Sequence, residues 1–276
     1  MMAAAAGPPR AVAIERIRGA LAALGRTSRG LFEPALMICA LAFGVLREAP
    51  LISSWRRPVR AEFRRALRQA VAGGLITTMV AATLVGIAMI DQALLWLGEV
   101  GEERLIGGIL ITILVREVTP VIVGLIVLGR SGIAAAAETA TLQLGGQIDT
   151  LTAQGIDPFL VVVLPRALAL ALGCYTLGTV FVMVAMGIGV IVANLTGGAA
   201  MSLGELFATV LGAMKVADFI IFPAKMLAIG LLIGLTSTLT GLTARTGDDA
   251  RRLLPRAFVR GTLAIMLVTV TLSLAL

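Results

Sequence analysis

The chain has 276 residues, of which 58% are hydrophobic and 14% charged, and its mean hydropathy is +0.99. Soluble domains are closer to half apolar and a quarter charged, so the composition indicates an all-α integral membrane protein with one helical domain. The sequence contains no His, which excludes a His general base, and we expect no zinc or other metal site.

Twelve of the 23 Lys and Arg residues precede Ala70, without the aromatic residues that nucleic-acid-binding modules add. This excess is typical of cytoplasmic segments of membrane proteins, and we expect no nucleic-acid partner.

The region 1–69 is predicted to be cytoplasmic or interfacial. Arg10–Arg29 has the pattern of a basic amphipathic helix lying in the membrane interface, and a surface helix packed on protein is the alternative. Leu31–Leu46 is apolar but has only 16 residues and contains Glu33 and Pro34. A full span needs about 20 residues, so this segment is predicted to be interfacial or re-entrant.

Residues 70–276 are predicted to form the transmembrane domain. The five expected spans are Ala70–Ile90, Leu105–Leu128, Phe159–Ala193, Phe219–Leu242 and Ala257–Leu276. The third is about 50 Å long, so we expect its Arg166 end to project into the cytoplasm. The distribution of Lys and Arg among the loops favours a cytoplasmic N-terminus and a C-terminus on the outer side.

Two adjacent charges, Arg116 and Glu117, lie near the centre of the second span. A charge at that depth costs about 2.5–3.5 kcal/mol, so such residues tend to face a cavity or each other. Pro120 has no backbone donor for the Arg116 carbonyl, which is therefore free to bind elsewhere. Lys225 in the fourth span is hypothesised to neutralise Glu117, with Arg116 nearby in a polar part of a transport cavity. An ion pair that only locks two helices together is the alternative.

The segment Arg130–Pro158 is predicted to be an inner loop carrying helices at Ala134–Leu144 and Gln147–Gln154. Gly155 would end the second helix, and Asp157 would cap the next span. A short helix held between two spans could receive movement from a cytoplasmic motor, and a simple connecting loop is the alternative. The chain has no phosphate-binding loop, so ATP-driven transport would require a second subunit that hydrolyses ATP.

Small residues share one face of the fourth span, at Gly230, Gly234 and Gly241. This spacing lets two helices approach closely. The contact could lie between two subunits or within one chain.

The run from Val115 to Ala169 resembles the MlaE-type permeases of MCE lipid-transport ABC systems. The matching pieces are Arg116-Glu117, Pro120, Gly129-Arg130, Gly132, Ala136-Ala137-Glu138, Gln147-Ile148-Asp149, Gly155, Asp157-Pro158 and Pro165-Arg166. A weaker match joins Asp218 to Lys225. The chain departs from the family pattern at Thr119, where Gly is usual, and at Gly145-Gly146, where Thr-Glu is usual.

The resemblance implies a noncatalytic permease subunit of an ATP-driven transporter that moves lipid, in particular phospholipid, across the bacterial cell envelope. Its partners would be a second permease copy, a cytoplasmic ABC ATPase dimer that binds ATP and Mg²⁺, and a periplasmic ring of MCE-domain proteins. The subunit itself would need no cofactor and would lie in the inner membrane with a periplasmic C-terminus.

The resemblance also implies roles for particular residues. Residues 134–154 would form the coupling helix, with ATPase contacts at Glu138, Gln147, Ile148, Asp149 and Leu151. The lipid cavity would be lined or braced by Arg116, Glu117, Pro120 and Lys225. An ion-coupled secondary transporter that uses Glu117 as its titrating group is the alternative. A membrane-embedded lipid enzyme is disfavoured because the chain shows no nucleophile–base pair or metal cluster.

Overall fold

The computed structural model describes residues 36–98, 110–195, 216–244 and 250–274, together with positions 204, 208, 212 and 214. Every regular element within these residues is helical. The major ones are α2 (Arg57–Gly98), η3 (Leu110–Val118), α4 (Thr119–Val127), η4 (Leu128–Gly132), α5 (Ile133–Leu144), α6 (Gln147–Ala153), η5 (Phe159–Val163), α7 (Leu164–Leu195), α9 (Val216–Leu242) and α10 (Ala250–Leu274). The elements η3, η4 and η5 are π-helical.

The prediction of five spans is confirmed. Five helices of the described residues are long and apolar enough to cross a membrane: Arg57–Met89, Ile113–Leu144, Phe159–Val192, Ala217–Leu242 and Leu253–Leu274. The chain is therefore a multi-pass membrane protein. Which side of the membrane each end faces stays a prediction.

The N-terminal region is only partly described. The chain divides into two compact units, residues 1–44 and 45–276, and the helices named above belong to the second. The predicted amphipathic helix Arg10–Arg29 lies outside the described residues. From position 36 to 48 the chain is helical, and the interfacial or re-entrant assignment of Leu31–Leu46 stays a prediction.

Helix α2 begins 13 residues before the predicted start of the first span, at Arg57 instead of Ala70. Pro58 stands in its first turn, where a missing backbone donor costs little. The helix then runs without a break through residues 69 and 70, where the region boundary was predicted. The basic segment is thus a helical extension of the span, because arginine is a good helix former and no glycine or proline interrupts residues 59–72.

The second span continues further than predicted. The elements η3, α4, η4 and α5 follow one another directly, so Arg130 lies within a helix and the prediction that it begins a loop was wrong. A glycine that ends a helix usually adopts a positive φ, and among the described residues only Gly146 and Gly155 do so. Gly129 and Gly132 therefore continue the helix. Close packing explains the glycine at 132, where a Cβ would lie 3.0 Å from side-chain atoms of α9.

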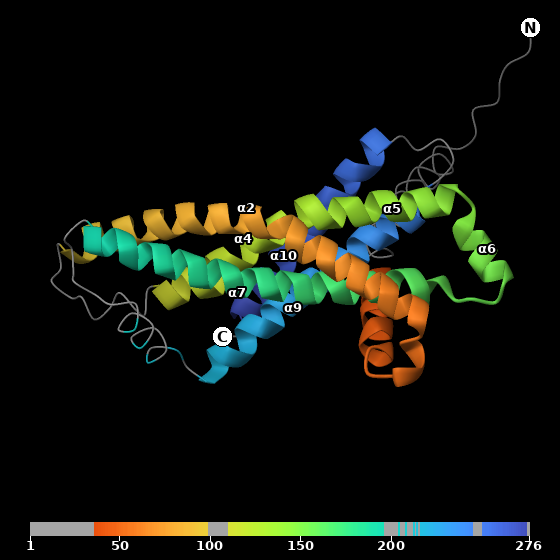
Figure 1. Ribbon diagram of the computed structural model, residues 1–276, viewed down its shortest axis with the longest axis horizontal. Coiled ribbons are helices and arrows are strands. Elements are labelled where there is room, and N and C mark those ends of the chain that lie inside the picture. The colour runs from red at the N-terminus through yellow and green to blue at the C-terminus, as the bar shows by residue number, and fades with distance from the viewer. Residues whose placement is uncertain are drawn as a thin grey trace, which may run out of the picture. The chain divides into compact units, whose positions relative to one another are not determined.

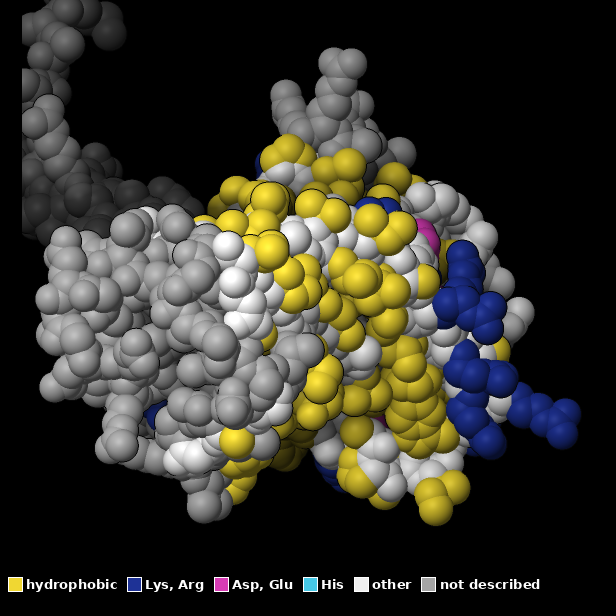
Figure 2. Space-filling model, turned by 60° about the vertical axis from the view of Figure 1, so that its left-hand side comes forward, with side chains coloured by type: hydrophobic (Ala, Val, Ile, Leu, Met, Phe, Trp, Pro, Cys, Tyr) yellow, Lys and Arg dark blue, Asp and Glu magenta, His cyan; other side chains and the backbone are white. Residues whose placement is uncertain are grey.

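The helices pack in pairs along their length. Helix α2 lies beside α7, α7 beside α9, and α9 also contacts α10 and α5 (Figure 1). The core contains large side chains that are fully buried, including Leu128, Leu177, Phe181, Met226 and Ile233. On the face shown in Figure 2, hydrophobic side chains form a broad band, and basic side chains gather at one edge of it. Such a band is what a surface in contact with lipid needs.

The glycine face of α9 packs within the chain. At Gly234 a Cβ would lie 2.6 Å from the Ala167 Cα of α7, and at Gly241 one would lie 2.6 Å from the Ala136 carbonyl oxygen of α5. Gly230 similarly faces the backbone of α7. Of the two interpretations left open, the structure therefore supports close approach inside one chain.

Candidate functional site

The first polar cluster is built around the π-helix η3 and Pro120. The hydroxyl of Thr119, which is fully buried, donates to the Leu114 carbonyl five residues earlier at 2.7 Å. Pro120 cannot donate to the Arg116 carbonyl, as predicted from the sequence. That carbonyl instead accepts a hydrogen bond from the Lys225 ammonium of α9 at 2.6 Å. An irregular helix thus exposes one backbone acceptor, which a buried cation occupies.

Lys225 is only 2% exposed and connects three spans. Besides the Arg116 carbonyl, its Nζ donates to the Ser273 hydroxyl of α10 at 2.8 Å and lies 3.5 Å from Glu117 Oε1. Ser273 in turn donates to the same Glu117 oxygen at 2.6 Å. The hypothesised pairing of Lys225 with Glu117 is therefore present, and a serine that the sequence analysis missed bridges the two. A serine in an apolar helix carries no signal in sequence that would distinguish it.

Arg116 pairs with Asp218, whereas Glu117 pairs with Lys225. The Arg116 Nη2 lies 2.6 Å from Asp218 Oδ1 at the start of α9, and the Asp218 side chain is 3% exposed. Asp218 is two helical turns before Lys225, so both side chains lie on one face of α9. Sequence reasoning found Asp218 only through the family resemblance, because its place at the predicted span end made it look solvated. The cluster balances two positive charges against two negative ones, which lowers the cost of placing them between helices.

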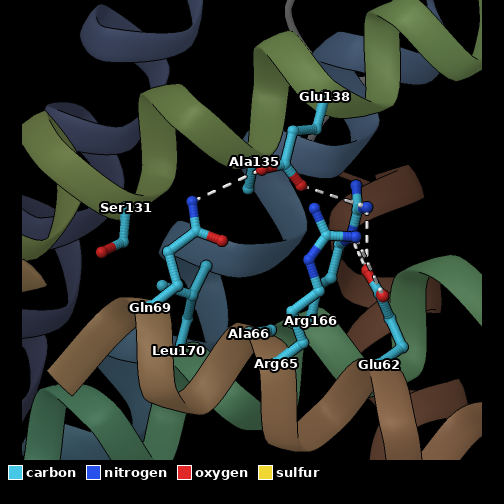
Figure 3. Close-up of a pocket in the computed structure, with 9 residues that line it drawn as sticks. All are labelled: Glu62, Arg65, Ala66, Gln69, Ser131, Ala135, Glu138, Arg166 and Leu170. Atoms are coloured by element: carbon cyan, nitrogen blue, oxygen red, sulfur yellow. Dashed lines mark hydrogen bonds and ion pairs between the residues drawn. The ribbon is translucent and has the colours of Figure 1, made fainter. Parts of the chain in front are cut away.

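A second polar cluster joins α2, α5 and α7 around Arg166, which is 6% exposed (Figure 3). Its Nε and Nη2 each lie 2.9 Å from Glu62 Oε1, and Nη2 lies 3.3 Å from Glu138 Oε2. Its Nη1 donates to the Thr139 hydroxyl at 2.7 Å. Gln69 completes the cluster by donating to Glu138 at 3.4 Å. The Arg166 side chain is therefore buried between helices, and Glu62 is a partner that sequence reasoning missed.

The loop after α5 is a sharp elbow. Gly146 has φ 69° and starts α6, and Gly155 has φ 73° just after α6 ends. The amides of Gly155 and Ile156 donate to the Thr152 and Leu151 carbonyls at 3.0 and 2.9 Å. This is the bonding pattern of a Schellman motif, which ends a helix at a glycine. Asp157 accepts from the Phe159 amide at 2.9 Å, as the cap prediction required.

The residues predicted to contact an ATPase divide into two groups. Gln147 and Asp149 are exposed on α6, whereas Ile148 is buried and Leu151 half-buried. Glu138 points at Arg166 and Gln69 of its own chain, so in this structure its contacts are with α7 and α2 (Figure 3). Beside α6 an open groove of about 490 Å³ is lined by residues of α2, α5, α6, η5 and α7, including Pro58, Gln147 and Val162. ATPase contact at these residues stays a prediction.

Among the described residues, no group of three or more His, Cys, Asp or Glu side chains is placed to hold a metal ion. The carboxylates of the two clusters face cations of the protein itself. These ion pairs connect neighbouring helices and neutralise charged side chains within the membrane.

Comparison with known proteins gives the family. Residues 63–275 match the family model described as Permease MlaE. The chain belongs to the MlaE permease family. This match covers four spans completely, the first span from residue 63 onward, and both polar clusters apart from Glu62, which lies one residue before it. The chain is thus a multi-pass transmembrane permease of this family.

Several relatives match shorter stretches of this MlaE permease. It is 38% identical over 107 residues to the Arabidopsis thaliana protein named TRIGALACTOSYLDIACYLGLYCEROL 1, chloroplastic, covering 36% of this chain and 31% of the relative. It is 42% identical over 67 residues to a probable ABC transporter permease protein of Rickettsia typhi, covering 24% of this chain and 26% of the relative. A probable ABC transporter permease protein of Porphyra purpurea is 25% identical over 175 residues, covering 63% of this chain and 66% of the relative. The matched segments thus span about a third or less of the first two relatives.

Proposed function

We propose that this permease subunit moves lipid, in particular phospholipid, through a cavity between two permease copies in a bacterial inner membrane. A cytoplasmic ATPase dimer supplies the movement by binding and hydrolysing ATP with Mg²⁺, and a periplasmic ring of MCE-domain proteins exchanges the lipid. The name of the Arabidopsis relative contains that of a galactolipid, which supports a lipid cargo.

One observation carries the proposal. The second span is a continuous helix from η3 to the end of α5, so the intramembrane cluster and the α5–α6 elbow are parts of one helical segment. At one end Arg116 and Glu117 are held by α9 and α10. At the other end α6 exposes Gln147 and Asp149 beyond the span. Force applied to α6 would therefore reach the charged part of the bundle through a single helix.

The test is reconstitution of the full chain with its companion ATPase in liposomes that contain a fluorescent phospholipid. ATP should drive transfer of the labelled lipid to an acceptor. Replacing both Gln147 and Asp149 by Ala should lower this transfer about tenfold, which corresponds to about 1.4 kcal/mol of lost coupling. Thr176→Ala is the control, since Thr176 is exposed on α7 and its hydroxyl bonds only within its own helix.

Two outcomes would contradict the proposal. If the complex isolated with this chain contained no ATPase and moved no lipid, the proposed function would be wrong. Transport by the chain alone under a proton gradient would favour the secondary transporter. That alternative has one supporting observation, because the Glu117 side chain is 47% exposed and therefore accessible to an ion.

A further inference from the structure

A groove lined by arginines lies along α2, and one of its lining residues, Gln69, also belongs to the cluster around Arg166. It has a volume of about 560 Å³, and it is lined by Ala61, Arg64, Arg65, Arg68, Gln69 and Ala72. The three arginines are all exposed. A volume of this size is within the range of small-ligand sites.

The positive charge of this groove is not neutralised by the part of the chain that the structure describes. Only Arg65 approaches a carboxylate there, at 4.0 Å from Glu62, and its side chain is 68% exposed. The same carboxylate lies much closer to Arg166, at 2.9 Å. Neither Arg64 nor Arg68 forms an ion pair with a described residue. The groove therefore concentrates cationic groups that have room for an external anion.

The groove continues into an apolar surface on the same face of the helix. Ala72, Ile76 and Met79 follow Arg68 at helical spacing, and the side chains of Ile76 and Met79 are 73% and 44% exposed. The distance along the helix from Arg68 to Met79 is about 16 Å. This is close to half the thickness of a bilayer's hydrocarbon core, about 15 Å. Cationic groups thus stand at one end of an apolar strip as long as one leaflet.

We propose that this groove binds the headgroup of an anionic phospholipid, with the acyl chains lying along Ala72, Ile76 and Met79. Arginine suits this role because its planar guanidinium donates two parallel hydrogen bonds to a phosphate group. The Gln69 amide donates one hydrogen to Glu138, and its second hydrogen provides a neutral donor at the membrane side of the arginines. Its lining residues all belong to α2, whereas the charged residues assigned to the cargo cavity lie on η3 and α9. The proposal does not depend on the cargo being a lipid.

The experiment compares two double variants of the full chain in neutral detergent. Native mass spectrometry would measure the dissociation constants for dioleoylphosphatidylglycerol and dioleoylphosphatidylcholine. Arg64→Gln with Arg68→Gln removes two arginines spaced by one turn from the groove. Arg256→Gln with Arg260→Gln is matched to it, because these arginines are also exposed, have the same spacing on α10 and do not line the groove.

The first variant should bind phosphatidylglycerol about 30-fold more weakly, since each basic group near a membrane surface contributes about fivefold. The control should change the affinity less than twofold, and phosphatidylcholine should bind weakly and equally to all three proteins. Equal losses in both variants would show attraction by net charge only and would overturn the site. An unchanged affinity in the first variant would also overturn it. Loss of the companion ATPase with phosphatidylglycerol binding retained would assign the groove to a protein partner instead.

Discussion

Replacing Lys225 by Met tests the intramembrane cluster most directly. Methionine has a similar length and fills the same space, but it removes the two short hydrogen bonds to the Arg116 carbonyl and Ser273 and the longer contact with Glu117. Interhelical hydrogen bonds in membrane proteins contribute about 0.6 kcal/mol on average and up to about 1.7. The Glu117 charge, left without its cation, adds to the loss. We therefore expect Lys225→Met to reduce the free energy of unfolding by about 2–4 kcal/mol.

The coupling between Lys225 and Glu117 should be smaller than this total. Their closest atoms are 3.5 Å apart, and the Glu117 side chain is 47% exposed, so solvent screens the pair. We expect Glu117→Gln alone to cost about 1 kcal/mol, and the double variant to lose about 0.5–1 kcal/mol less than the two single losses together. Ser273→Ala should couple to both residues, because Ser273 bonds to each.

The assay is equilibrium unfolding of the full chain in mixed micelles, followed by circular dichroism, with lipid transfer measured in parallel. Crossing Glu117→Gln with Thr176→Ala provides the control, since these residues share no contact and their effects should add. If the losses from Lys225→Met and Glu117→Gln add to within about 0.3–0.5 kcal/mol, the pair does not contribute to stability and the proposed pairing is contradicted.

Three further predictions use the same unfolding measurement. Arg166→Met should lower the free energy of unfolding by about 3–5 kcal/mol, because it leaves two carboxylates without their cation. Glu138→Gln should lower it by only about 1 kcal/mol, since the Glu138 side chain is 35% exposed. Equal losses would contradict this ranking. Thr119→Val removes the 2.7 Å bond to the Leu114 carbonyl in a buried place and should cost about 1 kcal/mol, while Thr119→Ser should be close to neutral. Gly241→Ala should cost about 1–3 kcal/mol because its Cβ meets the α5 backbone, whereas Gly73→Ala, with nothing within 4 Å, should stabilise the helix by up to about 1 kcal/mol. A neutral or stabilising effect of Gly241→Ala would show that the α5–α9 contact is looser than described.

Hydropathy was enough to predict the spans, and single residues of unusual cost predicted the centre of the first cluster. Arg116, Glu117, Lys225 and Pro120 were identifiable because charges and proline are rare in apolar helices. The partner Ser273 was not, and Asp218 was found only through the family resemblance, because the role of each depends on which helices are neighbours. Distances between helices come from tertiary packing, and no periodicity within one helix encodes them.

The second cluster was hidden for a related reason. Glu62, Glu138 and Arg166 lie in segments that read as solvated ends of helices, where a charge needs no partner. Their burial follows from two features that sequence reasoning did not capture. Helix α2 begins at Arg57, and α5 continues the second span without a turn, so three helix ends overlap around Arg166.

The elbow and the second span move as one unit only if α5 is fixed on both sides. On one side Glu138 is bound to Arg166 of α7, and on the other Ala136 and Ala140 press against Gly241 of α9. Each contact holds the same three turns of helix, so breaking either should already release part of what the other secures. The double variant Arg166→Met with Gly241→Ala should therefore lose less stability than the single variants together, by about 0.5 kcal/mol or more. Strict additivity would mean that the two contacts act on independent parts of α5, and α5 would then not be held as one unit by its neighbours.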